Sequence, residues 1–367
     1  MKKLILLLTL LLTFNLIAEA KTVRVALNPN TKRERIKIED STIFINLSNN
    51  KSYKISDTGT FTAKKLSSGE VRVGNIKSKK GVKIISRGYI TINKKKYEGN
   101  ILILPTKHRT IDVVEEIDLE KYLYGVLPYE MSASWKLEAL KSQAVTARTY
   151  TLATMRDNRK INFDVYADTR SQVYGSSVNP ANKVKRAVDE TKGEVLTYKD
   201  KTFYTYYHGN CGGETSSPPW MKDTPKVLQG AKCRYDRHSP NYQWSRTFNN
   251  TEINKALKNL KVKGKIKDLR ISDKDKSGRT TSLKIQTTNT TKYVSCNNFR
   301  IAIGASKLKS CKFTGVSKVS NGYMFVGKGY GHGAGLCQDG AHGMAMDGIK
   351  YKEILLNYYP GSKLIKI

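Results

Sequence analysis

Short apolar runs broken by polar turns dominate residues 21–110. Apolar and β-branched residues gather at 22–27, 42–47, 82–85, 89–92 and 101–104, and Asn, Ser and Gly separate them. Runs of this length between such breakers predict β-strands. Lysines crowd the turns and edges, where their charge discourages pairing with other chains. We therefore expect a β-rich accessory region, in which no catalytic constellation is visible.

The pattern changes near residue 110, where apolar positions begin to recur at helical spacing. Residues 111–115 predict a strand, and Asp118 can cap the short helix that follows it. Gly125 and Pro128 would end that helix. Ser134 can cap a second helix, whose apolar stripe would be Leu137, Leu140, Ala144, Ala147 and Thr151. The sequence thus predicts an α+β protein, with a β-rich N-terminal portion followed by a mixed α/β region.

A glutamate, Glu130, stands in the connection between these two helices, flanked by Tyr129 and Met131. Apolar neighbours there would raise its pKa, as a general acid needs in order to hold a proton near neutral pH. The alternative is a helix-flanking acid that caps backbone amides, and spacing alone favours that structural role over a catalytic one. Lys141 and Arg148 share one face of the second helix, which in so basic a chain is usually a solvated face.

An export signal is the best interpretation of the N-terminus. Two lysines precede a nearly continuous apolar run at 4–17, and Ala18-Glu19-Ala20 fits a small-x-small cleavage site. The run is short for a membrane-spanning helix, although an uncleaved anchor is the alternative. We therefore predict a protein exported to the periplasm or cell envelope, with no transmembrane segment after signal cleavage.

The charge balance indicates a polyanionic partner. The chain has 65 Lys and Arg against 31 Asp and Glu, a formal net charge of +34 at pH 7. Nucleic acid, an acidic membrane face and an acidic envelope polymer all fit such a surplus. Export argues against nucleic acid, because an exported protein rarely meets the chromosome.

Five cysteines occur, none of them in a C-x-x-C pair. An oxidising compartment favours disulfides, and chain order suggests Cys211–Cys233 and Cys296–Cys311 with Cys337 left over. Sequence does not prove that connectivity. The fragment His208-x-x-Cys211 could hold a metal, but two ligands are weak evidence for one.

Several motifs in order resemble the SpoIID/LytB family of peptidoglycan lytic transglycosylases and amidase enhancers. They span roughly residues 111–367. The matching stretches are YLYGVLPYEMSASWKLEALKSQAVTARTY at 122–150, DTRSQVY at 168–174, TKGEVLTY at 191–198, YYHGNCGGET at 206–215, Trp220, Ser277-Gly-Arg279, Phe299-Arg300, GYGHGAGLCQDGA at 329–341 and YYPG at 358–361.

The resemblance implies cleavage of the glycan strand after N-acetylmuramic acid, leaving a 1,6-anhydro end. It implies that Glu130 is the catalytic acid/base and that Lys141 and Arg148 bind substrate. One carboxyl group suffices for such a reaction, because the sugar's own 6-hydroxyl attacks, whereas common hydrolases need two. The family also accepts strands stripped of stem peptides, which implies an amidase working upstream.

Two departures from the family pattern stand out. Some relatives bind zinc through Cys and His residues around the Gln-Val-Tyr motif, but residues 163–174 here contain neither. We therefore predict no metal and no cofactor. Cys337 replaces the usual Ser before Gln338, and a thiol is the weaker hydrogen-bond donor.

Other motif residues are candidate substrate contacts. Gln172 and Tyr174 are expected near the cleft, through amide bonding and sugar stacking. Tyr207 and His208 precede a glycine pair that lets a ligand approach the backbone. His332 lies in a glycine-rich turn that lacks the Lys-Ser/Thr of a nucleotide-binding loop. For His208 a structural role is an even alternative.

The sequence thus predicts three parts: a signal peptide at 1–20, a β-rich accessory region at 21–110 and a SpoIID-like catalytic domain at 111–367. The function predicted is that of an exported lytic transglycosylase acting on peptidoglycan, through Glu130. The alternative is a non-catalytic wall-binding enhancer of an N-acetylmuramoyl-L-alanine amidase. Expected partners are glycan strands and a cell-wall amidase; interleaved aromatic and basic motifs for nucleic acid are missing.

Overall fold

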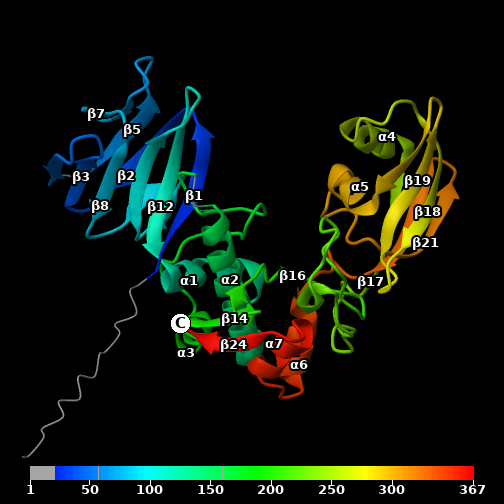
Figure 1. Ribbon diagram of the computed structural model, residues 1–367. Helices are drawn as coiled ribbons and strands as arrows, with labels where there is room; N and C mark the ends of the chain where they lie inside the picture. Colours follow the sequence, from blue (N-terminus) through cyan, green and yellow to red (C-terminus); the bar gives the residue numbers. More distant parts are fainter. Residues whose placement is uncertain (1–20, 57, 159–160) are drawn as a thin grey trace, which may run out of the picture.

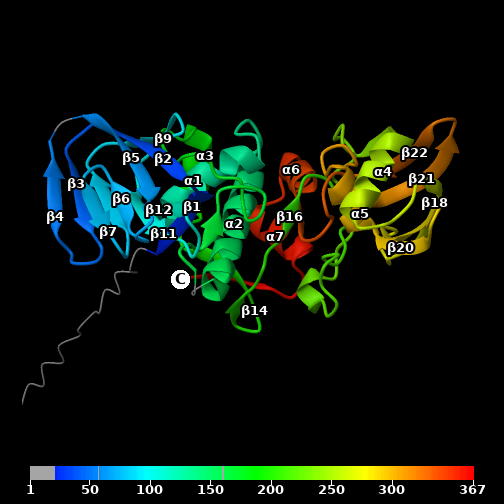
Figure 2. The ribbon, with the colours of Figure 1, turned by 90° about the horizontal axis from the view of Figure 1, so that it is seen from above.

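The computed structural model describes residues 21–56, 58–158 and 161–367, so the predicted signal peptide at 1–20 lies outside the described residues. A β-rich N-terminal part and a smaller α/β unit lie on opposite sides of a group of central helices (Figures 1 and 2). This arrangement confirms the predicted α+β class. Within the described ranges, no helix combines the length and apolar character needed to cross a membrane.

The N-terminal part consists of a seven-stranded and a six-stranded sheet. All five strands predicted from the apolar runs are present, as β1, β3, β8, β9 and β11. The strands of this part are β1 (Thr22–Thr31), β2 (Arg33–Ile38), β3 (Thr42–Asn46), β4 (Ser52–Ile55), β5 (Gly59–Lys65), β6 (Val71–Val73), β7 (Ile76–Ser78), β8 (Val82–Ser86), β9 (Ile90–Ile92), β10 (Lys95–Tyr97), β11 (Asn100–Pro105) and β12 (Ile111–Asp118).

The β-rich part is continuous with the central helices. Strand β12 pairs with both β1 and β11, so the boundary predicted at residue 110 falls between two paired strands. Strand β13 (Val165–Tyr166), from the central part, pairs in parallel with β1. Next to it, Arg24 and Asp164 form an ion pair with a 2.7 Å N–O distance. One hydrophobic core therefore extends from the N-terminal strands into the helices.

The central part is built around α2, which is buried along most of its length. As predicted, the Asp118 carboxylate caps α1 by accepting the Glu120 and Lys121 N–H groups. The elements of this part are α1 (Leu119–Glu130), α2 (Leu137–Asp157), α3 (Asn182–Glu190), β14 (Glu194–Tyr198), β15 (Lys201–Thr202), β16 (Tyr207–His208), β23 (Leu336–Cys337), α6 (Gln338–Met346), α7 (Tyr351–Tyr358) and β24 (Lys363–Lys366).

Two predicted helix boundaries are wrong. Helix α1 continues through Pro128 to Glu130, because a proline in the last turn removes one backbone donor while the Met131 N–H still reaches the Leu127 carbonyl at 2.9 Å. Glu130 therefore ends the helix and does not stand in the connection after it. Helix α2 begins at Leu137, and Ser134 hydrogen-bonds Ser132 instead of capping it.

A separate α/β unit interrupts the central part, and the sequence did not predict it. It has its own hydrophobic core, which includes Leu283, Phe299 and Phe325. The elements in this stretch are a 3-10 turn η1 (Lys226–Leu228), β17 (Gln243–Asn249), α4 (Asn250–Asn259), β18 (Ile266–Lys274), β19 (Thr280–Thr287), β20 (Thr291–Ser295), α5 (Cys296–Ile303), β21 (Lys312–Val319) and β22 (Gly322–Lys328).

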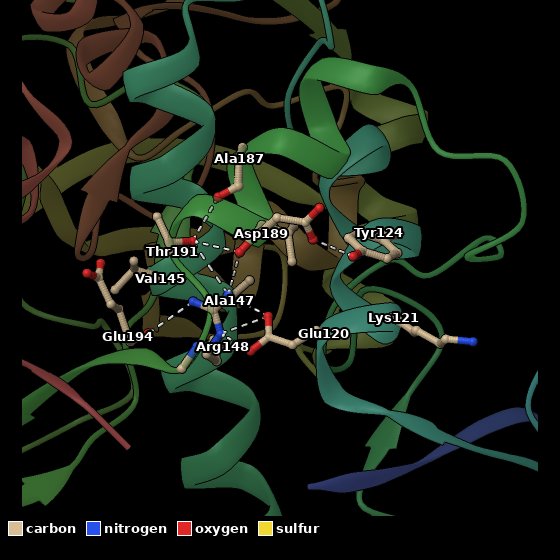
Figure 3. Close-up of polar contacts among 12 residues, drawn as sticks. Glu120, Lys121, Tyr124, Val145, Ala147, Arg148, Ala187, Asp189, Thr191 and Glu194 are labelled. Atoms are coloured by element: carbon tan, nitrogen blue, oxygen red, sulfur yellow. Dashed lines mark hydrogen bonds and ion pairs between the residues drawn. The ribbon is translucent and has the colours of Figure 1, made fainter. Parts of the chain in front are cut away.

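Arg148 joins four elements of the central part (Figure 3). Its side chain has no exposed surface, and its Nη2 lies 2.6 Å from Glu120 Oε2 on α1. Nη1 donates to the Glu194 carbonyl of β14 at 3.0 Å, and Nη2 approaches the Val188 carbonyl of α3 at 3.4 Å. The fork of a guanidinium suits such a junction, because it offers several donors in one plane.

We predict that Arg148→Met lowers the free energy of unfolding by about 3 kcal/mol or more, because removing one partner of a buried ion pair leaves the other charge uncompensated. Glu120→Gln should destabilise in the same way, and the double variant should lose less than the sum of the two. Urea unfolding of the three variants measures this. Normal stability of Arg148→Met would contradict the structural role of this arginine.

Glu115 is a second buried carboxyl group, at the junction between the two parts. Its Oε2 accepts the Tyr174 hydroxyl at 2.8 Å, and its Oε1 accepts the Gly99 N–H at 3.0 Å. The Tyr174 ring stacks on Tyr122 of α1 with centroids 5.1 Å apart. Burial raises the pKa of Glu115 to about 7, although both hydrogen bonds oppose that shift.

Because folding raises this pKa, the protonated group stabilises the fold fully below pH 4.5, and that contribution is lost as the pH rises through about 7. We predict that Glu115→Gln, whose amide oxygen can accept the Gly99 N–H while its amide nitrogen donates to the Tyr174 oxygen, gains stability relative to the wild type over this range, by about 1.4 kcal/mol for each unit of pKa shift. Urea unfolding of both proteins at pH 5 and pH 8 measures the difference. Parallel pH profiles would contradict it.

Candidate functional site

Glu130 lies at the C-terminal end of α1 and is half-buried. Its Oε1 accepts the Val173 backbone N–H at 3.2 Å, and the side chains of Tyr207 and Gln338 lie close enough to the carboxyl group to lower its pKa. These three partners come from the loop after β13, from β16 and from the start of α6. Segments far apart in the sequence thus converge on one carboxyl group.

The environment of Glu130 favours its protonated form. Burial raises the pKa of Glu130, while the Val173 N–H and the hydrogen bonds from Tyr207 and Gln338 oppose that shift. Burial also raises the pKa of Tyr207 far above its ordinary value, so this phenol stays neutral. A carboxyl group whose pKa is raised by burial, and which still has donors for its anion, has the features that a group needs in order to give and take a proton.

Gln172 sets the orientation of Tyr207. The Gln172 amide is 1% exposed, and its Nε2 donates to the Tyr207 hydroxyl at 3.1 Å. Its Oε1 lies 2.8 Å from the Thr151 hydroxyl oxygen of α2 and 3.4 Å from that of Tyr122. Because Tyr207 accepts from Gln172, its own proton is free to point at Glu130. The amide predicted to bind substrate is instead oriented toward a neighbour of the carboxyl group.

A close approach between the loop and α1 holds the Val173 N–H in place. The Gly175 N–H donates to the Gly125 carbonyl at 3.1 Å. A Cβ at Gly125 would lie 2.4 Å from the Tyr174 ring, so only glycine lets the loop lie this close to the helix. Tyr174 itself is 3% exposed and packs in the core, so its ring is not available for sugar stacking.

His208 and His332 form a second group, apart from the contacts of Glu130. Their rings lie 5.4 Å apart, and their Nδ1 atoms hydrogen-bond the carbonyl and the N–H of Ala334, respectively. Neighbouring side chains of a strand point to opposite faces, which explains why Tyr207 reaches Glu130 while His208 reaches His332. Burial, with Arg300 and Arg279 nearby, lowers the pKa of His332 to about 3.

A pocket of about 210 Å³ opens beside His332, between the central part and the inserted unit. Arg279 and Arg300 line it, and the Nε and Nη1 atoms of Arg279 have no hydrogen-bond partner among the described residues. Two buried guanidinium groups, a neutral imidazole and the Asp275 carboxylate line the pocket, which therefore offers both donors and an acceptor to a polar ligand. The histidines predicted to contact substrate therefore lie with this pocket.

Lys141 and Arg148 are engaged elsewhere. Lys141 Nζ lies 3.1 Å from a Glu138 carboxylate oxygen and 2.5 Å from one of Glu190, and it is mostly buried. Arg148 is enclosed by its own partners (Figure 3). Substrate binding by these two residues stays a prediction, and their contacts favour a role in holding α2 against α3.

Sequence reasoning missed Gln338 and Tyr129. Gln338 had been noted only as part of a motif, and nothing in the order of the chain brings it next to Glu130. Tyr129 is 54% exposed and adjoins Glu130 in the sequence, so its ring is available to a sugar. The sequence signal that could have identified Tyr129 as a candidate sugar contact is an aromatic residue next to a candidate catalytic acid.

The cysteines differ from the prediction as well. All five are thiols, so neither predicted bridge is present in the structure. Cys211, Cys233 and Cys337 meet Asp236 in one buried group, whose potential metal-binding atoms lie within 4.8 Å of one another. None of these residues belongs to the stretch around Gln172.

Comparison with known proteins agrees with the motifs. A family model described as Stage II sporulation protein matches residues 107–198, and one described as a domain of unknown function (DUF8618) matches residues 221–335, which include the inserted unit. An uncharacterized protein of Brachyspira hyodysenteriae is 37% identical over 78% of this chain and 77% of its own length.

Two relatives carry functional names. The amidase enhancer of Bacillus subtilis is 32% identical over 85% of this chain, which spans about half (51%) of that protein. Stage II sporulation protein D of Bacillus amyloliquefaciens is 30% identical over 68% of this chain and 74% of its own length. The chain therefore belongs to the SpoIID/LytB family, which includes stage II sporulation protein D and the amidase enhancer.

Proposed function

We propose that the protein is an exported lytic transglycosylase that cleaves peptidoglycan strands after N-acetylmuramic acid, with Glu130 as general acid and base. The observation that carries this proposal is the half-buried carboxyl group, whose pKa burial raises and whose anion has three donors. Family membership supports a cell-wall-related function. Peptide-stripped strands are the substrate expected from the resemblance.

In the proposed reaction, protonated Glu130 gives its proton to the glycosidic oxygen as the bond to the anomeric carbon breaks. The 6-hydroxyl of the same sugar then attacks that carbon, and its proton passes to the Glu130 carboxylate. The acid is regenerated and water is not consumed. A single carboxyl group meets this need, whereas the common hydrolases require a pair.

Tyr207 and Gln172 are positioning residues in this scheme. The Tyr207 hydroxyl stabilises the carboxylate form of Glu130 after the first proton transfer, and Gln172 holds the phenol in that orientation. A hydrogen bond to an ionised group is worth about twice a neutral one. The exposed ring of Tyr129 is a candidate sugar platform at the same end of α1.

A second candidate is a non-catalytic enhancer of an N-acetylmuramoyl-L-alanine amidase. The similarity to the Bacillus subtilis amidase enhancer favours it. The net charge of +34 suits retention on an anionic wall polymer under either proposal. The two functions differ in whether the protein itself creates new glycan ends.

We predict that the purified protein releases 1,6-anhydro-muramic ends from peptide-stripped strands, and that Glu130→Gln lowers the rate by about 10²-fold or more, because an amide can neither give the first proton nor take up the second. Mass spectrometry of the products measures this. Asp118→Asn is unsuitable as a control because it affects the cap of α1. The matched control is Glu353→Gln, which makes the same substitution at an exposed position outside the site. This variant should cleave at the wild-type rate.

Three outcomes would contradict this proposal. Hydrolytic reducing ends would exclude the transglycosylase reaction. Equal rates for Glu130→Gln and wild type would exclude this residue as the acid. Wall binding without new ends, together with stimulation of an added amidase, would establish the enhancer instead.

We predict that Tyr207→Phe shifts the alkaline limb of the pH–rate profile to higher pH. The Tyr207 hydroxyl lowers the pKa of Glu130, so its removal raises that pKa and keeps the acid protonated to higher pH. Tyr204→Phe is the matched control, because its hydroxyl bonds the exposed Asp157 at 2.6 Å. A Tyr207→Phe profile that coincides with that of the control would contradict the contact.

A further inference from the structure

Three thiols and one carboxylate meet next to the paired strands β16 and β23, and none of them contacts Glu130. Cys211 follows β16, Cys233 and Asp236 lie in the loop after η1, and Cys337 precedes α6. All four side chains are buried, and their potential ligand atoms lie within 4.8 Å of one another. We propose that Cys211, Cys233, Cys337 and Asp236 bind one zinc ion in a closed, four-ligand structural site.

The donor set fits zinc better than the alternatives. Soft thiolates select zinc over magnesium or calcium, and four protein ligands without an open position are typical of structural zinc. Zinc binds thiolate sulfur at about 2.3 Å and carboxylate oxygen at about 2.0–2.2 Å, so atoms grouped this closely can share one ion. Cys211 Sγ and Asp236 Oδ2 are already 3.1 Å apart.

Asp236 gives independent evidence for a cation. Its Oδ2 accepts the N–H groups of Gly212 and Gly213 at 2.8 and 3.1 Å. Its Oδ1 is buried and has no hydrogen-bond partner among the described residues. An unpaired carboxylate oxygen in the interior is costly, and a metal ion would remove that cost. The two N–H bonds orient the carboxylate in the way outer contacts orient metal ligands.

The sulfur atoms also have donors around them. Cys337 Sγ lies 3.2 Å from the Cys211 N–H nitrogen and 3.4 Å from that of Gly340, in the first turn of α6. Cys233 Sγ lies 3.1 Å from the Tyr358 hydroxyl. These N–H and O–H groups can orient the sulfur atoms in the way outer contacts orient metal ligands. Arg279 donates to the Cys211 carbonyl at 2.6 Å and adds positive charge beside the cluster.

A disulfide explains the cluster less well than zinc. Three cysteines can form one bridge, which would leave the third sulfur as a free thiol and Asp236 Oδ1 buried without a partner among the described residues. Zinc engages all four groups at once. Cys296 and Cys311, by contrast, do not belong to this group.

The proposed zinc site lies where a metal ion would stabilise the strand pair β16 and β23. Tyr207 and Leu336 are paired residues of the parallel strands β16 and β23, as are His208 and Cys337. Cys337 directly precedes Gln338, which contacts Glu130. Zinc would therefore fasten β16, which carries Tyr207, to β23, which leads directly into Gln338 at the start of α6. The metal proposal itself does not depend on which reaction Glu130 performs.

The test is the metal content of the purified protein, measured by mass spectrometry after gel filtration in chelator-free buffer. We expect about one zinc per chain, and much less in Cys337→Ser and Asp236→Asn. Cys311→Ser, which removes a cysteine outside the cluster, should keep its zinc. Circular dichroism of each variant shows whether a loss of metal accompanies a loss of fold.

A second measurement uses the wild type alone, so a variant that fails to fold cannot obscure the answer. Metal-free protein titrated with cobalt should develop thiolate-to-cobalt charge-transfer absorption and the intense visible bands of a tetrahedral site, saturating at one equivalent. Zinc should then displace them. A protein that holds no zinc and whose reduced form takes up no cobalt would overturn the proposal. A disulfide between any two of Cys211, Cys233 and Cys337 that persists when zinc is supplied would also overturn it.

Discussion

The buried ion pair between Arg148 and Glu120 is the interaction on which the central part depends. It binds the first turn of α1 to α2, and the remaining donors of Arg148 reach α3 and β14. Because α1 is rigid between its ends, the pair at its start fixes where Glu130 lies at its finish. The contacts of this guanidinium thus help to set the position of the carboxyl group that we propose as the acid.

The site combines desolvation with donors for the anion. Burial raises the pKa of Glu130 and its donors lower it, a balance that would suit the proposed acid and base. The donors come from a loop, a strand and a helix start, so the whole central part must fold before the site exists. The histidine pair lies on the other side of β16, where Arg279, Arg300 and Asp275 line a pocket beside His332.

Local patterns predicted local structure well. The apolar runs identified strands, and Asp118 identified the start of α1. The end of α1 was misjudged because Pro128 costs a helix little in its last turn. Contacts between residues far apart in the chain could not be predicted from the sequence. Spacing predicted that Lys141 and Arg148 share one helix face but did not reveal the carboxylates that pair with them. The four residues of the proposed zinc site are likewise spread over three segments, so they do not form a short ligand motif from which the sequence could predict the site.

The central claim is that Glu130 drives cleavage by an internal hydroxyl and not by water. Digestion of peptide-stripped strands in water labelled with heavy oxygen tests it most directly. The account predicts cleaved strands with 1,6-anhydro ends that contain no label. Heavy oxygen at the new reducing ends, or strands left uncut, would contradict it.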